Sequence, residues 1–309
     1  MPLRLEGLEV VLTGGFATLG RAEARALLSS AGARVVDSVS PGTDLVFYGG
    51  PGAGKLIEAE VLGVPAWSER AMLDALGVLP PVEVEGPLSD FAGRWGRMVG
   101  ELRVDPRVHL LNAHLGLPAS EEELDRIEAR ALAPLPLALR NLYRQANGAT
   151  LAWCARGAEN PGLLNGPLTP ERVMELGVPM GGCVCLLPLE DLFSDDTPIS
   201  WGDDAPTIRL GERELDASRF HAALRVFDSF SMQRVMAIWL ERRTGEHEVV
   251  MGDEYGARFT HSRRTDVECY IKAILDTRGA VDVRRVMFQS DADGLARDRI
   301  IWPQPHTQF

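Results

Sequence analysis

Lysine, histidine and cysteine are scarce in this chain of 309 residues, and the scarcity of histidine and cysteine argues against two classes of site. Of the 32 basic residues, only Lys55 and Lys272 are lysines. The six histidines are scattered and the four cysteines form no Cys-x-x-Cys pair, so we expect neither a metal centre nor a disulfide framework. Cys183 and Cys185 alternate within an apolar run, which predicts buried thiols on one side of a strand in a reducing compartment.

Long apolar runs are also missing. None approaches the roughly 18 residues of a transmembrane helix, and the first residues lack a basic segment followed by an apolar one. We therefore expect a cytoplasmic protein without a membrane partner. The length favours two domains. The net charge of −12 opposes bulk binding to a nucleic-acid backbone and suits a basic protein partner.

Short apolar strands alternate with amphipathic helices in the first 79 residues. The pattern predicts strands at 9–13, 33–36, 45–48 and 65–67, with helices after the first, third and fourth. Alternation of this kind predicts an α/β fold, a mostly parallel four-stranded sheet with helices on both faces.

Three residues of this region suit an anion. Thr13 and Gly14 close the first strand, and Lys55 opens the second helix. A hydroxyl, a backbone N–H and a lysine at a helix N-terminus can converge on one phosphate. A solvated surface lysine is the alternative interpretation. Segment 49–55 also fits the G-x-x-x-x-G-K of a nucleotide-binding loop, but Leu56 stands where Ser or Thr would reach magnesium, which disfavours nucleotide hydrolysis.

Segment 8–76 resembles a BRCT domain, closest to the one at the end of bacterial NAD-dependent DNA ligases. The matching residues are Val10-Val11-Leu12-Thr13-Gly14, Ala31-Gly32-Ala33, Thr43-Asp44-Leu45-Val46, Lys55, Ala59, Gly63-Val64-Pro65 and Trp67-Ser68. The resemblance implies a pocket at Thr13, Gly14 and Lys55 for a phosphopeptide or a DNA 5′-phosphate.

A proline-rich break divides the chain. Leu79-Pro80-Pro81 opens a stretch without apolar periodicity. We assign 1–79 to the first domain, 80–90 to a linker, 91–286 to a second domain and 287–309 to a C-terminal tail. The two domains are expected to fold independently.

The second half predicts an α+β domain with an antiparallel sheet. Its signals are an amphipathic helix from Phe91, a capping box at Ser120–Glu123, a proline-started helix closed by Asn147-Gly148, a strand at 182–187, a hairpin at 235–251 and a helix at 265–275.

Segment 110–280 resembles the SUKH superfamily, which includes yeast cell-wall regulators of the Smi/Knr type and bacterial immunity proteins. The matching pieces are Leu135 to Gly148, the strand followed by Leu187 to Leu192, and the hairpin before the last helix, with insertions at 155–180 and 194–225. The resemblance implies a non-catalytic domain that binds a partner protein, such as a basic toxin.

Acidic loops of the second half are candidate partner contacts, although plain exposed loops are the alternative. Their residues are Asp195, Asp196, Asp203, Asp204, Asp253 and Glu254. No nucleophile motif stands out, so we predict no catalytic residues and no cofactor. The sequence favours a non-catalytic protein of the immunity or antitoxin type whose BRCT-like domain recruits a phosphorylated or DNA-associated partner. The alternative is an adaptor in DNA repair or replication.

Overall fold

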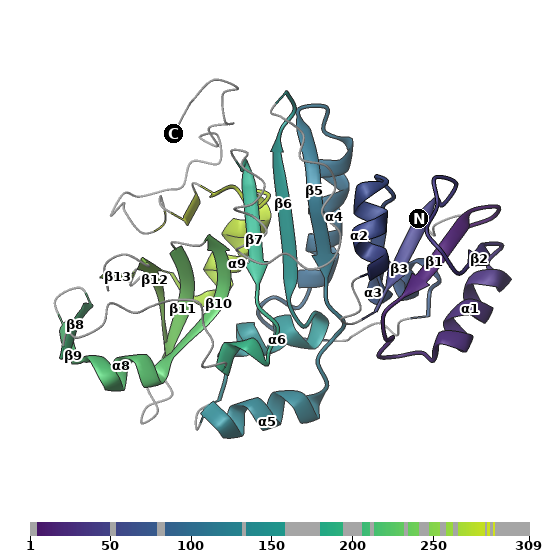
Figure 1. Cartoon of the computed structure of the whole chain (residues 1–309). Helices are drawn as coiled ribbons and strands as arrows, with labels where there is room; N and C mark the ends of the chain where they lie inside the picture. Colours follow the sequence, from purple (N-terminus) through teal and green to yellow (C-terminus); the bar gives the residue numbers. More distant parts are fainter. Residues whose placement is uncertain are drawn as a thin grey trace.

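The computed structural model describes residues 5–49, 54–78, 84–131, 134–157, 180–193, 206–210, 213–231, 234–240, 247–253, 258–261, 265–281, 283–284 and 287. These residues form two domains that lie side by side (Figure 1).

A parallel sheet is the centre of the N-terminal domain. Its strands lie in the order β2-β1-β3-β4, and all three neighbouring pairs are parallel. The strands are β1 (Glu9–Thr13), β2 (Arg34–Val36), β3 (Leu45–Tyr48) and β4 (Ala66–Ser68), and the helices are α1 (Arg21–Ser30), α2 (Gly54–Val61) and α3 (Glu69–Ala75). The predicted order of elements and the parallel sheet are confirmed.

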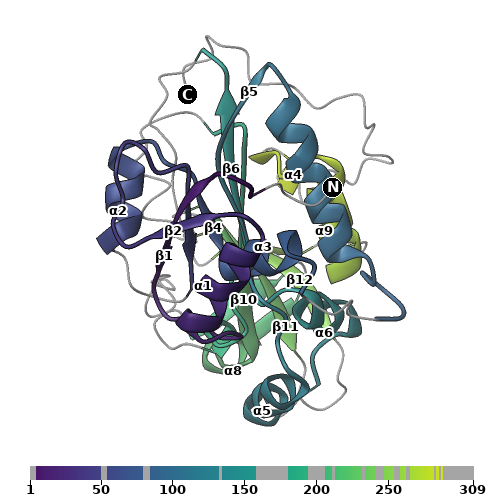
Figure 2. The ribbon, with the colours of Figure 1, turned by 90° about the vertical axis from the view of Figure 1, so that its right-hand side faces the viewer.

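Helices cover both faces of this sheet, because successive apolar side chains of β1 point to opposite faces and both must be buried. Val10 and Leu12 pack with α1 and α3 in one cluster, whereas Val11 packs against Ala59 of α2 on the opposite face. Figure 2 shows α2 on one side of the sheet and α1 with α3 on the other.

The second domain is built on a nine-stranded sheet in the order β5-β6-β7-β10-β11-β12-β13-β8-β9. Its strands are β5 (Val108–Leu115), β6 (Ala149–Ala155), β7 (Gly182–Leu186), β8 (Thr207–Leu210), β9 (Arg213–Asp216), β10 (Leu224–Ser231), β11 (Arg234–Leu240), β12 (His247–Asp253) and β13 (Arg258–His261). Neighbours are antiparallel except β13 and β8, which are parallel. The predicted antiparallel sheet is therefore confirmed, with one parallel pair.

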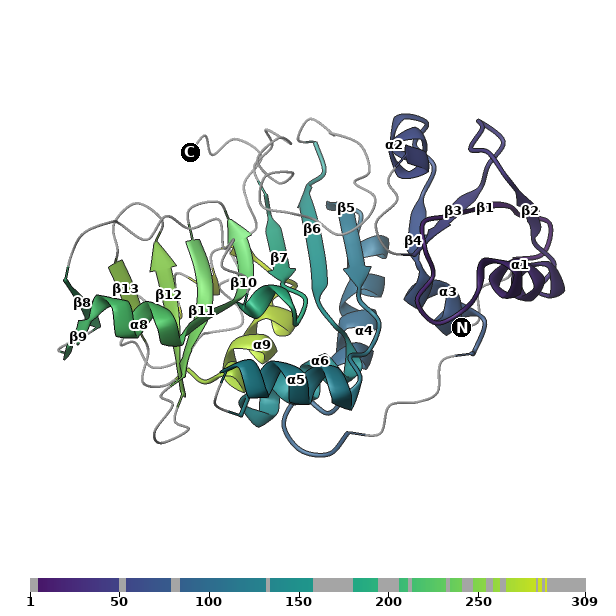
Figure 3. The ribbon, with the colours of Figure 1, turned by 60° about the horizontal axis from the view of Figure 1, so that its bottom comes forward.

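One face of the large sheet carries the main core of the protein. Helices α4 (Phe91–Val104), α6 (Leu137–Gln145) and α9 (Val267–Asp276) contact one another and pack their apolar residues against β6, β7 and β10–β12. Figure 3 shows these helices on one side of the sheet. Helix α5 (Glu121–Ala131) packs on α6, the 3-10 turn η1 (Asp191–Phe193) contacts β10, and α8 (Ala217–Ala223) packs with β8 and β11 in a separate cluster.

Local signals of the second half predict the start of a helix better than its end. Ser120 and Glu123 form the predicted capping box, in which the N–H of Ser120 donates to Glu123 Oε2 at 2.7 Å and the N–H of Glu123 donates to Ser120 Oγ at 3.2 Å. The predicted left-handed stop at Asn147-Gly148 is wrong, because α6 already ends at Gln145 with an extended Ala146, and Gly148, with a φ of +88°, lies two residues farther on. Part of the predicted linker is anchored to the second domain, since Asn141 Nδ2 donates to the carbonyl oxygens of Glu85 and Pro87 at 3.0 and 2.9 Å.

Several predictions fall outside the described residues. These are the start of the linker at 80–83, most of the insertion at 155–180, the start of the insertion at 194–225, and nearly all of the tail at 287–309. The described part of the second insertion contains β8, β9, α8 and the first residues of β10.

Candidate phosphate site and interdomain cleft

The carboxyl-terminal edge of the parallel sheet holds all three residues of the predicted phosphate site. Thr13 ends β1 and its side chain lies on the same face as Val11, which is the face covered by α2. Thr13 is only 5% exposed. Gly14 follows with a φ of +77°, a left-handed conformation that favours glycine.

Lys55 lies in the first turn of α2 and reaches back over this edge. Its Nζ donates to the backbone carbonyl oxygen of Asp37 at 2.5 Å, just after β2. Helix α2 follows β3, and β1 lies between β3 and β2 in the sheet. The structure therefore brings Lys55 to the strand edge at which Thr13 and Gly14 lie. The carboxylate of Asp37 is paired with Arg25 beside this lysine.

A second set of backbone donors near this edge is already occupied. The N–H groups of Ala17, Thr18 and Leu19 donate to the carboxylate of Glu69 at 2.6, 2.7 and 3.3 Å. Glu69 begins α3 and is 3% exposed. Consecutive N–H groups before a helix form a concavity that suits an anion. Here an internal carboxylate fills that concavity.

The strand end is also closely packed. The N–H of Gly49 donates to the carbonyl oxygen of Thr13 at 3.1 Å. A Cβ at Gly49 would stand 2.4 Å from the carbonyl oxygen of Gly15 and 2.8 Å from the Cα of Phe16. A glycine is therefore required where the loops after β1 and β3 touch. Residues 50–53 of the predicted glycine-rich loop lie outside the described part.

The two domains are joined by buried and partly buried polar contacts that the sequence did not indicate. The hydroxyl of Tyr48 in β3 lies 2.6 Å from Nδ1 of His114 in β5, and their rings are stacked. Burial lowers the pKa of His114 to about 4 and raises that of Tyr48. Both groups are therefore neutral at pH 7, and the tautomer of His114 sets which of them donates in the hydrogen bond that they share.

Arg70 contributes further hydrogen bonds to the same interface. Arg70 of α3 is buried, and its Nη1 donates to the carbonyl oxygen of Gly116 at 3.2 Å and to that of Gln145. Ser68 Oγ donates to the carbonyl oxygen of Leu115 at 3.5 Å. These contacts hold the carboxyl end of β4 against the carboxyl end of β5.

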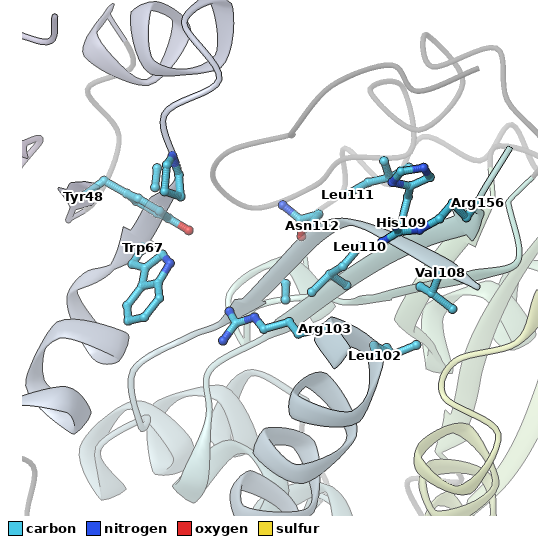
Figure 4. A pocket seen from close by; sticks show the side chains of 13 residues that line it. Tyr48, Trp67, Leu102, Arg103, Val108, His109, Leu110, Leu111, Asn112 and Arg156 are labelled. Carbon is cyan, nitrogen blue, oxygen red and sulfur yellow. The ribbon is translucent and has the colours of Figure 1, made fainter. Parts of the chain in front are cut away.

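Away from these contacts the two strands diverge around a cleft. Its volume is about 440 Å³, and Figure 4 shows Tyr48 and Trp67 on the wall opposite Arg103 and Leu110. The lining residues are Tyr48, Pro65, Ala66 and Trp67 from the first domain and Leu102, Arg103, Val108, His109, Leu110, Leu111, Asn112, Ala113 and Arg156 from the second. The guanidinium of Arg103 stacks over Trp67, 5.5 Å from the ring centroid.

Five of the six acidic residues that we predicted as partner contacts fall outside the described part of the chain. These are Asp195, Asp196, Asp203, Asp204 and Glu254. Asp253 ends β12, where its backbone pairs with Arg234 and Arg258.

A buried charged cluster is the main feature of the second domain that sequence reasoning missed. Arg284 Nη2 lies 2.6 Å from Asp228 Oδ2, Tyr270 donates to the same oxygen at 2.5 Å, and Arg284 Nε donates to the Tyr270 hydroxyl at 2.7 Å. Arg284 and Asp228 are 1% and 0% exposed. The cluster ties β10 and α9 to the segment after α9, so its geometry indicates a structural role.

Within the described ranges, no group of three or more His, Cys, Asp or Glu residues is arranged to hold a metal ion. No helix in that part of the chain is long and apolar enough to cross a membrane.

Comparison with known proteins identifies the first domain. Residues 2–76 match the family model of the BRCA1 C Terminus (BRCT) domain. The same region is similar to a DNA ligase from Macrococcus caseolyticus (strain JCSC5402), with 42% identity over 67 residues. That match covers 22% of this chain and 10% of the ligase. The N-terminal domain is therefore a BRCT domain with a homologue in a DNA ligase, and the chain spans only a small part of that relative.

Proposed function

We propose that this chain is a non-catalytic binding protein whose BRCT domain recruits a phosphorylated or DNA-associated partner. The observation that carries the proposal is the position of Lys55, whose ammonium group crosses the strand edge where Thr13 and Gly14 lie. In this proposal a phosphate displaces the carbonyl oxygen of Asp37 as the acceptor for Lys55. The Thr13 hydroxyl and the Gly14 N–H then complete its coordination.

The second domain is proposed to bind a partner protein, as the resemblance to SUKH domains implies. Two contacts support this proposal because they join the two segments on which the resemblance rests. The Tyr143 hydroxyl donates to the carbonyl oxygen of Leu187 at 2.9 Å, and the N–H of Leu189 donates to Asn147 Oδ1 at 2.6 Å. An immunity protein that neutralises a basic toxin is the function that follows from this resemblance.

The similarity to a DNA ligase favours a second candidate. An adaptor in DNA repair or replication would use the BRCT domain in the same way, with the second domain as a scaffold. Affinity capture with the full chain followed by mass spectrometry separates the two. Recovery of a small basic toxin favours immunity, and recovery of replication or repair proteins favours the adaptor.

The phosphate site is tested with the full chain and paired ligands. A phosphoserine peptide, the same peptide without phosphate, and DNA duplexes with and without a 5′-phosphate are titrated. Replacement Lys55→Ala should weaken binding of the phosphorylated ligands by about 1.5–3 kcal/mol, the scale of a hydrogen bond to a charged group. Lys272→Ala is the matched control, since it removes the other lysine, which is exposed on α9 and paired with Glu268.

Equal affinities for the phosphorylated and unphosphorylated ligands would reject the phosphate site. A loss of affinity in Lys272→Ala as large as that in Lys55→Ala would show that the effect is one of net charge alone.

A further inference from the structure

The cleft between the two domains lies between two strands that each end a sheet. Among the strands that the structure describes, β4 ends the four-stranded sheet and pairs with β3, while β5 ends the nine-stranded sheet and pairs with β6. Successive residues of a strand point to opposite faces. The cleft is nevertheless lined by six consecutive residues of β5, 108–113, and by three consecutive residues at β4, 65–67. A cavity that touches every residue of a strand lies against its backbone edge.

The separation of these two edges is set by the interface at one end of the cleft. The contacts Tyr48–His114, Ser68–Leu115 and the hydrogen bonds of Arg70 hold the carboxyl ends of β4 and β5 together. Strand β5 then runs away from them toward Val108 and Arg156, at the other end of the cleft lining. Six residues of extended chain span about 20 Å, so this edge is long enough for a short peptide.

The charge of the cleft is opposite to that of the chain. Arg103, His109 and Arg156 line it, and no Asp or Glu is present among its described lining residues, although the chain carries a net charge of −12. No described carboxylate lies within ion-pair distance of Arg103 or Arg156. Clefts lined by one sign of charge concentrate ligands of the opposite sign.

The aromatic rings at this site already contact other side chains of the protein, which favours a peptide over a single nucleic-acid strand as the ligand. The ring of Tyr48 stacks on His114, and the ring of Trp67 lies under the guanidinium of Arg103. Binding of a single strand relies on aromatic faces that are free to stack on bases. Addition of a peptide to a sheet edge relies instead on unpaired backbone groups.

We propose that an extended peptide with acidic side chains binds in this cleft by adding a strand to the edge of β5. The backbone of the peptide pairs with β5, and its carboxylates pair with Arg103 and Arg156. The register of β5 against β6 shifts between Leu110 and Asn112. The regular edge before this shift, Val108–Leu110, lies nearest Arg156 and is the first part to pair. This site is separate from the phosphate site at Thr13 and Lys55 and does not depend on it.

The test uses the full chain and a fluorescein-labelled peptide that alternates glutamate and valine. We expect it to bind at least about tenfold more tightly than the lysine–valine counterpart, more weakly at high salt, and to slow hydrogen exchange of the amides in segment 108–113. The double variant Arg103→Gln/Arg156→Gln should lose at least about tenfold in affinity. Arg97→Gln is the matched control because Arg97 is an exposed arginine on the same helix as Arg103 and does not line the cleft.

Three results would overturn the proposal. A glutamate–proline peptide that binds equally well would exclude strand addition, because proline lacks the N–H groups that a ladder needs. Unchanged binding by the double variant, with its thermal melt also unchanged, would place the peptide elsewhere. Tighter binding of a single-stranded oligonucleotide than of the peptide, lost in the same variant, would assign the cleft to nucleic acid.

Discussion

Mild acid should destabilise the docked arrangement of the two domains through His114. In the unfolded chain its pKa is near the ordinary 6.5, whereas burial at the interface lowers it to about 4. The unfolded state therefore binds the proton more readily than the folded state. The stability that depends on neutral His114 is complete above about pH 6.5 and is lost as the pH falls toward 4.

The magnitude follows from the two pKa values. Each pH unit between them corresponds to about 1.4 kcal/mol, so the full loss is about 3 kcal/mol, of which about 2 kcal/mol is already lost at about pH 5. Protonation also makes both ring nitrogens of His114 donors and places a positive charge beside Tyr48, so we expect the loss of stability at the interface. Hydrogen exchange should then accelerate in β3 and around Leu115.

The assay is urea unfolding of the full chain at about pH 7.5 and about pH 5, in wild type and in His114→Asn. The asparagine offers an oxygen acceptor to Tyr48 and cannot be protonated in this range. His109→Asn is the control on the same strand. Burial also lowers the pKa values of His221 and His247, and these groups contribute equally to all three proteins. A wild-type loss between the two pH values that equals the loss in His114→Asn would refute the reasoning.

Two further changes probe the cores of the domains. Asp228→Asn leaves Arg284 buried without a counter-ion and should lower the free energy of unfolding in urea by about 3–5 kcal/mol. The double variant Asp228→Leu/Arg284→Met should lower it by less. An equal loss in both variants would show that the experiment measures packing and not the unpaired charge. Gly49→Ala places a methyl group 2.4 Å from the carbonyl oxygen of Gly15 and should destabilise the BRCT domain by about 1–3 kcal/mol in thermal unfolding. Gly15→Ala is the control and should be nearly neutral, because a Cβ there meets nothing within 4 Å. A similar loss of stability in the two variants would contradict the packing argument.

The elements that the sequence predicted well are those with local causes. Strand β1 matches the predicted residues 9–13, and α2 begins one residue before Lys55. The capping box at Ser120 can be recognised in the sequence as a helix start, since both of its hydrogen bonds join residues three positions apart. Apolar periodicity and caps act within one or two turns, so a single sequence displays them.

The contacts that organise the candidate sites join distant segments, which local patterns do not reveal. Tyr48 meets His114 across 66 positions, and Asp228 meets Arg284 across 56. Glu69 is an ordinary acidic residue at a helix start by its sequence, but its carboxylate accepts three N–H groups from the loop after β1. In each case the residue looks ordinary in the sequence, and its specific contact forms only when two distant segments meet in the folded protein.

The proposed phosphate site and the domain interface share one pair of adjacent strands. Thr13 and Tyr48 are direct partners in the β1–β3 pairing, and Gly49 donates to the carbonyl oxygen of Thr13 immediately after Tyr48. Tyr48 is also the residue that contacts His114. A ligand that binds Thr13 more tightly in the docked arrangement must, by linkage, also favour docking of the domains. The shared β1–β3 edge offers a short physical route for this coupling, because one hydrogen-bonded residue pair separates the proposed site from the interface.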